Sequence, residues 1–295
     1  MILGRDREKV IDNIRRYSES GEFYNKVELD DPVLTAEQEN QITDNYLKRR
    51  KTLPFKFKSA VARFAANRLT DMINKDTEII GLSKVENLKG GAFVTSNHFS
   101  PVENTVIRHL TRELGKKRLN VVSQVSNLAM PGLIGFLMNY ADIIPLSGSI
   151  HYMKRTFSQL LAEYVENGEW VLIYPEQEMW FNYRKPRPPK RGAYYYAAET
   201  GAPVVSCFVE ITDLNQKDTE EFYKVRYTLH ILEVLYPDPE KSVKENSILL
   251  SKRDYELKKQ AYEKAYGKPL DYKFESPDIA GWCCKNEKSE KNQVL

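Results

Sequence analysis

Short apolar runs alternate with amphipathic segments through the middle of the chain. Six runs have the composition of strands: residues 92–96, 119–123, 142–146, 170–174, 204–209 and 223–235. Segments 153–166 and 194–200 show the helical spacing of apolar residues, and Gly201 is a typical residue to end the second. Strands and helices that alternate in this way predict an α/β domain with a largely parallel sheet, whose binding sites lie at the carboxyl ends of strands.

Helical segments are expected on both sides of this domain. Residues 5–17 and the residues after Leu34 show helical patterns, and a charged helix is expected over residues 240–266. We therefore divide the chain into three regions: an N-terminal helical segment (1–75), an α/β domain (76–236), and a C-terminal helix with a polar tail (237–295). The fold class predicted is α/β, a mixed and largely parallel sheet flanked by helices.

The last part of the N-terminal segment combines a basic face with an apolar face. Residues 47–70 contain no acid and eight basic side chains, and apolar residues recur at spacings of three and four from Phe57 to Ile73. This pattern is typical of an amphipathic helix, here over residues 56–73, that lies in a membrane interface. A helix that packs its apolar face on the domain explains the pattern equally well. No nucleic-acid-binding motif accompanies the basic residues, so no nucleic-acid partner is expected.

Composition sets limits on the compartment and on cofactors. The chain has 295 residues, 41% of them hydrophobic, and a formal net charge of +3, so a strongly basic surface requires local clustering. Its three cysteines have neither metal-ligand spacing nor the pattern of a disulfide framework, which indicates a reducing compartment and no metal site. No apolar signal region is recognised, and no window reaches the ~18 apolar residues of a membrane-spanning helix. We therefore expect a cytoplasmic protein without a membrane anchor or a bound cofactor.

The most informative stretch covers residues 97–103, where a predicted strand gives way to a helix. His98 falls in the turn, and residues 100–103 have the pattern of an N-cap, a proline at the first helical position and an acid at the third. Glu103 would then point back to the turn, accept the Nδ1 proton of His98 and leave Nε2 free as a base. The same residues also fit a capping box in which Glu103 bonds only the Ser100 backbone, and the residues alone leave both interpretations open.

A second polar stretch follows the predicted strand 170–174. Glu176 and Gln177 come almost directly after it, and buried polar groups at such a place are costly unless they contact a ligand, a helix end or water. A proline-rich loop then carries five basic residues, from Arg184 to Arg191, into the start of a helix whose N-terminus is itself positive. This combination predicts an anion site. An ordinary solvated loop is the competing interpretation.

These stretches resemble the conserved blocks of the glycerolipid acyltransferases, the lysophosphatidic acid acyltransferase-like family. Asn97-His98, four further residues and Glu103 are similar to its H-x4-D box. The later blocks are matched in order by Pro175-Glu176, Lys190-Arg191-Gly192-Ala193 and Gly201-Ala202-Pro203-Val204-Val205. The resemblance covers residues 90–211. It implies a glycerophosphate-acyltransferase-like fold, an acyl-CoA or acyl-carrier-protein donor and a lysolipid acceptor.

The resemblance also suggests roles for individual residues. It assigns His98 and Glu103 to catalysis, and it places Lys190 and Gly192 at matching positions of the F-K-x-G block. The full set of substrate contacts that we expect is Asn97, Glu176, Gln177, Arg184, Lys190, Arg191 and Gly192.

The chain departs from the family pattern where the acceptor phosphate is usually held. Residues 177–179 are Gln-Glu-Met in place of Gly-Thr-Arg, and residues 144–146 are Ile-Pro-Leu in place of Ile-x-Arg, so both family arginines are missing. Glu103 also replaces the usual aspartate, and Ser206 replaces a proline. Basic residues of the 184–191 loop are the alternative candidates for holding a phosphate. An acceptor that is another lysophospholipid, a glycolipid or an aminolipid explains the departures as well.

The implied chemistry is direct acyl transfer to a lipid hydroxyl. His98 takes the hydroxyl proton, Glu103 orients the imidazole, and backbone N–H groups near residues 176–178 or at a helix start stabilise the oxyanion. No Gly-x-Ser-x-Gly elbow is present and Cys207 lies in a strand-like run, so no acyl-enzyme is expected. Two other functions stay open: an acyl-thioester hydrolase with the same dyad, and a non-catalytic membrane-surface lipid-binding module. We expect a peripheral protein on the inner face of a membrane.

Overall fold

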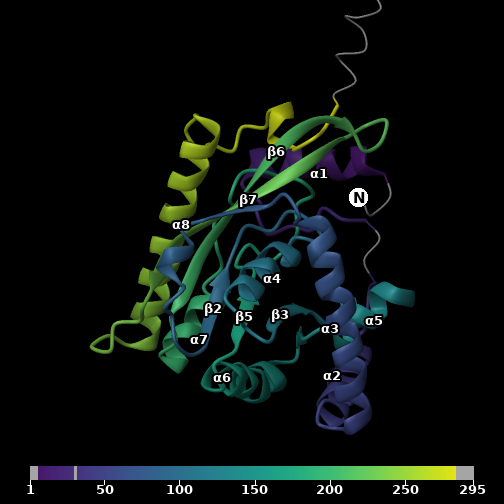
Figure 1. The fold of residues 1–295 in the computed structure, drawn as a ribbon, viewed down its shortest axis with the longest axis vertical. Coiled ribbons are helices and arrows are strands. Elements are labelled where there is room, and N and C mark those ends of the chain that lie inside the picture. Colours follow the sequence, from purple (N-terminus) through teal and green to yellow (C-terminus); the bar gives the residue numbers. More distant parts are fainter. Residues whose placement is uncertain (1–5, 30–31, 284–295) are drawn as a thin grey trace, which may run out of the picture.

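A seven-stranded sheet forms the centre of the computed structural model, which describes residues 6–29 and 32–283 (Figure 1). The strands are β1 (Glu78–Ile80), β2 (Ala92–Thr95), β3 (Leu119–Gln124), β4 (Ile143–Leu146), β5 (Trp170–Ile173), β6 (Val204–Lys217) and β7 (Tyr223–Leu235). Their order is β1-β7-β6-β2-β5-β3-β4, and of the neighbouring pairs only β6 and β7 are antiparallel. The predicted mixed, largely parallel sheet is therefore confirmed.

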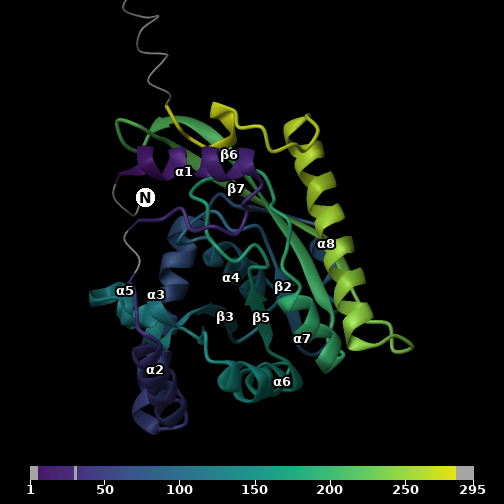
Figure 2. The ribbon, with the colours of Figure 1, turned by 180° about the vertical axis from the view of Figure 1, so that it is seen from behind.

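Helices surround the sheet, and they are α1 (Arg7–Ser20), α2 (Ala36–Arg49), α3 (Leu53–Ile73), α4 (Asn104–Glu113), α5 (Gly132–Tyr140), α6 (Ser158–Glu166), α7 (Gly192–Thr200) and α8 (Val243–Tyr266). A π-helical turn (Tyr152–Phe157) precedes α6, and short 3-10 helices occupy Leu82–Lys84, Val125–Ala129 and Ser276–Asp278. Figures 1 and 2 show α7 and α8 on one side of the molecule and α3 on the other. The predicted tail beyond residue 283 lies outside the described residues.

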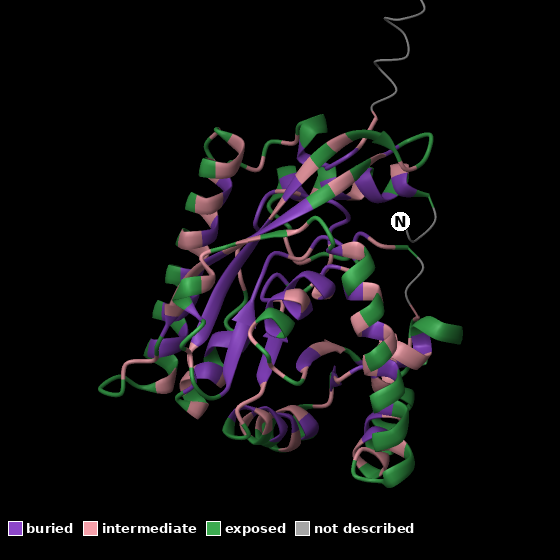
Figure 3. Cartoon of the chain, viewed as in Figure 1, coloured by how far each residue is buried: buried purple, intermediate pink, exposed green. Residues whose placement is uncertain are grey.

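The central strands separate two hydrophobic cores. All four positions of β2 are buried, as expected for a parallel strand with helices on both faces. Because side chains alternate along a strand, Phe93 packs in the core that includes Leu161 of α6 and Tyr194 of α7, whereas Val94 packs in the core that includes Leu110 of α4. Figure 3 shows this buried centre. The alternation fixes which helices flank the loop that follows β2.

A third core lies over the loop that follows β5. Val10 and Ile14 of α1 pack with Trp180 and Tyr183, all of them almost completely buried. The Trp180 Nε1–H group donates a hydrogen bond to the Asn25 carbonyl at 3.1 Å. The N-terminal segment is therefore attached to the same loop that carries the second polar stretch of the sequence.

Helix α3 presents its large apolar side chains to solvent. Its buried face consists of small residues, Ala62, Ala66 and Thr70 among them. Phe57, Phe64 and Met72 are 72%, 64% and 74% exposed. The amphipathic helix expected over residues 56–73 is thus present within α3, and its aromatic stripe does not pack on the domain. Among the described helices, none has both the length and the apolarity that a membrane span requires.

Candidate active site

The two polar stretches of the sequence meet at one edge of the sheet. Strands β2 and β5 are parallel neighbours in a register that pairs Thr95 with Ile173 at their carboxyl ends. The loops that continue from these ends therefore begin side by side. The Glu176 carboxylate accepts a hydrogen bond from the His98 backbone N–H at 3.2 Å, which joins the two loops directly.

His98 and Glu103 form the pair that the sequence predicted. Nδ1 of His98 contacts Oε1 of Glu103, and Oε2 of the same carboxylate accepts hydrogen bonds from the backbone N–H groups of Phe99 and Ser100, the latter at 2.7 Å. Three donors thus hold one buried carboxylate, and hydrogen bonds to a charged acceptor are the strong ones. One oxygen therefore caps the turn and the other contacts the imidazole, so Glu103 does not bond the Ser100 backbone alone.

The helix after this turn begins later than the sequence predicted. Helix α4 starts at Asn104, with Glu103 as its N-cap residue, so Ser100 is not the N-cap and Glu103 is not at the third helical position. A separate turn precedes the helix, in which the Glu103 N–H donates to the Ser100 carbonyl at 3.2 Å. The turn places the Glu103 carboxylate beside the backbone N–H groups of Phe99 and Ser100, both of which precede the helix.

Tyr174 is a component of the site that the sequence analysis missed. Its ring stacks on the His98 imidazole, with centroids 4.2 Å apart and planes at 7°. Burial, together with the nearby charge of Glu103, raises the pKa of Tyr174 well above its ordinary value, so its hydroxyl keeps its proton at neutral pH. Stacking on one face and the Glu103 contact at one edge fix the imidazole in a single orientation. The position of Tyr174 at the end of an apolar run made it look like an ordinary core residue.

Asn97 connects the histidine loop to β6. Its Nδ2 group donates to the Val209 carbonyl at 3.0 Å, and its Oδ1 accepts from the Val209 N–H at 2.8 Å. The side chain is 1% exposed, so both ends of the amide are occupied within the protein. The structure therefore gives Asn97 a positioning contact, and a contact with substrate stays a prediction.

A buried ion pair holds the second loop against the first. Glu176 is 3% exposed and accepts hydrogen bonds from Arg187 Nε and from the Arg187 backbone N–H, each at 3.1 Å. Burial raises the pKa of Glu176, an effect that the Arg187 guanidinium opposes. The same guanidinium donates to the carbonyls of Phe23 and Glu178. Because Arg187 is enclosed by these partners, it does not stand in for the arginines that the family uses on its substrate.

Other cations of the 184–191 loop are also paired inside the protein. Arg184 bonds Asp213 at 2.5 Å, and Lys185 bonds Asp278 at 2.7 Å with both side chains 1% exposed. A contact between Arg184 and a substrate phosphate stays a prediction, and the phosphate would have to compete with Asp213. Lys190, Arg191 and Gly192 are exposed at the start of α7, and the Lys190 ammonium lies 3.7 Å from the centre of the Tyr24 ring.

Gln177 adopts a backbone conformation that favours glycine. Its φ is 68°, in the left-handed region, and its side chain is exposed. The acyltransferase blocks that this stretch resembles carry Gly at this position, a residue that adopts such a conformation without strain. The N–H groups of Gln177 and Glu178 donate to the carbonyls of Tyr174 at 3.2 Å and Glu176 at 3.0 Å. These two amides, which we expected to serve an oxyanion, are therefore occupied within the turn.

Other reactive groups of the described residues do not form a second catalytic centre at this edge. Burial raises the pKa of the Cys207 thiol to about 12, so it is not a nucleophile at neutral pH. His230 is paired with Glu210 at 2.8 Å on the antiparallel β6–β7 ribbon. In the described part of the chain, no group of three or more His, Cys, Asp or Glu residues is arranged to hold a metal ion.

A family model matches the part of the chain that contains this site. Residues 76–210 match the family model described as Acyltransferase, and this segment contains the His98–Glu103 pair, Tyr174, Glu176 and the start of α7. This segment is therefore similar to the acyltransferase family, as the resemblance of the sequence blocks predicted.

Among solved structures, the chain is similar to the 1-acyl-sn-glycerophosphate (LPA) acyltransferase PlsC from Thermotoga maritima. The two share 18% sequence identity with a TM-score of 0.49, over 80% of this chain and 100% of that one. No curated protein sequence matches this chain.

Proposed function

We propose that the protein transfers a fatty acyl group from an acyl thioester, carried by coenzyme A or acyl-carrier protein, to a hydroxyl of a lysophospholipid or a related lipid. The observation that supports this most is the His98–Glu103 pair, which lies inside the segment that matches the Acyltransferase family model. Because Nδ1 faces the carboxylate, Nε2 is left to accept a proton. The His98 side chain is 20% exposed and that of Glu103 is 3% exposed, so the imidazole alone is open to a substrate.

Proton transfer through His98 accounts for each bond of the reaction. Nε2 takes the proton of the acceptor hydroxyl as its oxygen bonds to the thioester carbonyl carbon. The tetrahedral adduct then collapses, the carbon–sulfur bond breaks, and the leaving thiolate takes the proton back from the imidazolium. Glu103 stabilises the imidazolium between the two transfers. A positioned base of this kind contributes roughly 10²- to 10⁴-fold to the rate.

The acceptor phosphate, if the acceptor has one, is assigned to the start of α7. Lys190 and Arg191 are exposed there, and no described carboxylate is paired with either of them. Free N–H groups at a helix N-terminus add to the attraction of an anion. This assignment replaces the two missing family arginines with cations that the fold leaves available.

We further propose that α3 lies in the interface of a membrane, on its inner face, where the lipid acceptor is found. Its exposed stripe of Phe57, Phe64 and Met72 is flanked by Lys58 and Arg68, which are also exposed. Apolar side chains beside basic ones are what an interfacial helix offers to a bilayer with anionic lipids. Helix α5, which contacts α3, adds an exposed Leu133.

The test is thiol release from a long-chain acyl-CoA, with and without a panel of lysolipids, and products resolved by mass. His98→Ala removes the base, and His151→Ala is a matched control because His151 is exposed and lies on another segment. Acceptor-dependent release that His98→Ala abolishes and His151→Ala retains is the expected result. Release without an acceptor would instead identify a thioester hydrolase. No release with acyl-CoA or with acyl-carrier-protein donors would leave the lipid-binding module.

A further inference from the structure

A basic pocket lies away from the proposed acyl-transfer site. The cavity of about 220 Å³ is formed by Asn67 of α3, the C-terminal part of α4 and the segment 115–118 that leads into β3. Leu119, at the amino end of β3, lines the pocket, whereas His98 lies in the loop beyond the carboxyl end of β2. Because β3, β5 and β2 are neighbouring parallel strands, the pocket and the imidazole lie toward opposite ends of the sheet.

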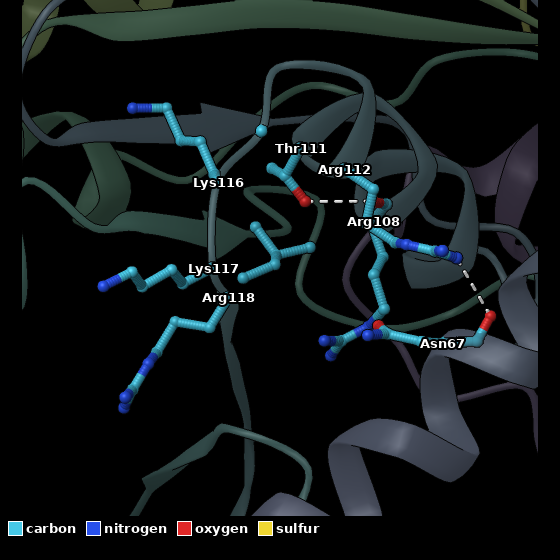
Figure 4. Close-up of a pocket in the computed structure, with 9 residues that line it drawn as sticks. Asn67, Arg108, Thr111, Arg112, Lys116, Lys117 and Arg118 are labelled. Atoms are coloured by element: carbon cyan, nitrogen blue, oxygen red, sulfur yellow. Dashed lines mark hydrogen bonds between the residues drawn. The ribbon is translucent and has the colours of Figure 1, made fainter.

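Positive charge dominates this pocket. Among the described residues that line it, none is acidic and five are basic: Arg108, Arg112, Lys116, Lys117 and Arg118. Figure 4 shows Arg108 and Arg112 on α4, and Lys116, Lys117 and Arg118 extending from the neighbouring segment away from these two arginines. All five cations line the pocket, so each contributes to the positive potential there.

Carboxylates behind the pocket neutralise only part of this charge. The three arginines have such partners: Arg108 with Asp142 at 3.8 Å, Arg112 with Asp71, and Arg118 with Glu169 at 3.4 Å. Asp142 is shared, because it also bonds Arg63 at 2.6 Å. Lys116 donates to the Gly90 carbonyl at 3.1 Å, and no described carboxylate pairs with Lys116 or Lys117. The pocket therefore keeps a surplus of positive charge.

Arg108 is a buried polar group that lacks a full set of partners. Its side chain is 4% exposed, and its buried Nε–H has no hydrogen-bond acceptor among the described residues. One of its terminal nitrogens donates to the Ala141 carbonyl at 3.3 Å. Burial lowers the pKa of Arg108, which expresses the cost of holding its charge away from water. An unpaired buried donor on a charged group is costly, and an anion in the pocket would reduce that cost.

We propose that this basic pocket binds the phosphate group of a phosphate ester, separate from the lipid substrate at His98. A cavity of 220 Å³ has the volume of roughly seven waters at ~30 Å³ each, which is ample for a phosphate and its hydration. Guanidinium groups bind phosphate oxygens in pairs, and lysines add point charges. The arginines and lysines that line the pocket are therefore the residue types that recognise a phosphate monoester or diester.

The surroundings favour a membrane lipid as the source of this phosphate. Asn67 lines the pocket, and Phe64, one turn before it on α3, is 64% exposed. A lipid headgroup in the pocket would leave the acyl chains beside this apolar stripe. One anionic lipid therefore satisfies the basic pocket and covers exposed apolar surface on the same helix, which a soluble phosphate ester does not.

The experiment compares two double variants of the full chain with the same change in charge. Lys116→Gln with Lys117→Gln alters the pocket, and Lys244→Gln with Lys252→Gln alters exposed positions of α8 on the other side of the molecule (Figure 1). Sedimentation measures binding to vesicles of phosphatidylcholine alone and of phosphatidylcholine with an equal amount of phosphatidylglycerol. Calorimetry with glycerol 3-phosphate measures binding of a soluble phosphate ester.

The expected result is that the pocket variant binds the anionic vesicles roughly 10- to 30-fold more weakly than wild type, while the α8 variant loses much less. Neither variant is expected to change binding to phosphatidylcholine alone. Unchanged vesicle binding with loss of the glycerol 3-phosphate heat in the pocket variant alone would support the pocket and assign it a soluble ligand. Equal losses in both double variants, or none in either assay, would overturn the proposal. Asn67→Asp, which adds a carboxylate from α3, is expected to reproduce the effect of the pocket variant.

Discussion

The Glu103→Gln substitution separates the two tasks of the Glu103 carboxylate. In the wild type one oxygen contacts His98 Nδ1 and the other accepts two backbone N–H groups, from Phe99 and Ser100. Glutamine keeps the shape of the side chain and supplies a single acceptor oxygen. That oxygen is best placed toward the two backbone donors, which turns the amide NH₂ group toward His98.

This rearrangement changes the tautomer of the imidazole. With an N–H donor opposite Nδ1, the neutral ring presents Nδ1 as an acceptor and carries its proton on Nε2, where it cannot accept the substrate proton. In the serine protease triad, the comparable replacement of aspartate by asparagine lowers kcat by about 10⁴. We expect a loss of roughly 10³- to 10⁴-fold in kcat for Glu103→Gln. Replacing charge-assisted by neutral hydrogen bonds should cost only about 1–3 kcal/mol of stability.

Acceptor-dependent thiol release and a thermal melt, measured on the same preparation, distinguish these effects. Glu103→Asp is the control, because it retains the charge with the residue that the family carries. Its shorter reach displaces the carboxylate, and we expect a loss of roughly 10- to 100-fold. If Glu103→Gln melts at a lower temperature but keeps kcat within about tenfold of wild type, Glu103 acts only as the cap of the turn, and the proposed dyad is refuted.

Three further predictions follow from the same region and from α3. Tyr174→Leu removes the ring that stacks on His98, and kcat should fall about tenfold while the protein stays folded, as checked by its near-UV circular dichroism. Gln177→Gly removes the strain of a left-handed φ of 68° and should raise the melting temperature. The strain of about 1–2 kcal/mol is larger than the free-energy cost of the greater backbone entropy that glycine has in the unfolded chain. A lower melting temperature would show that Gln177 is not strained. Phe57→Ser and Phe64→Ser should each weaken vesicle binding about tenfold without changing the melting temperature, because both side chains are exposed.

The apolar pattern was sufficient to predict the sheet but not its irregular parts. The run at residues 170–174 became β5, because a short apolar run is what a strand buried on both faces requires. Strand β1 has no such run, since its residues alternate between exposed and half-buried positions at the sheet edge. Helix α5 was not predicted either, because its apolar residues show no polar face that would mark a helical period. The π-helical turn before α6 has no sequence signal that we recognised.

At the site, local sequence was informative where the contact itself is local. His98 and Glu103 are close in the chain, so spacing alone placed them together, although the start of α4 was wrong by several residues. Tyr174 reaches His98 only because β2 and β5 are neighbours in the sheet. Spacing along the chain carries no information on such a contact, and the sheet order was not predicted.

The basic loop at residues 184–191 shows the same limit for charge. Its sequence predicts an anion site, yet three of its cations are bonded to acids that lie elsewhere in the chain or the site: Arg184 to Asp213, Lys185 to Asp278, and Arg187 to Glu176. Buried charges require such partners. Cations in a loop that folds inward are therefore paired inside the protein and are not available to a ligand. The cations left for ligands are those that the topology keeps from any described carboxylate, at the start of α7 and in the basic pocket. The two lie toward opposite ends of the strands, so a substrate phosphate and a membrane-lipid phosphate would be bound independently.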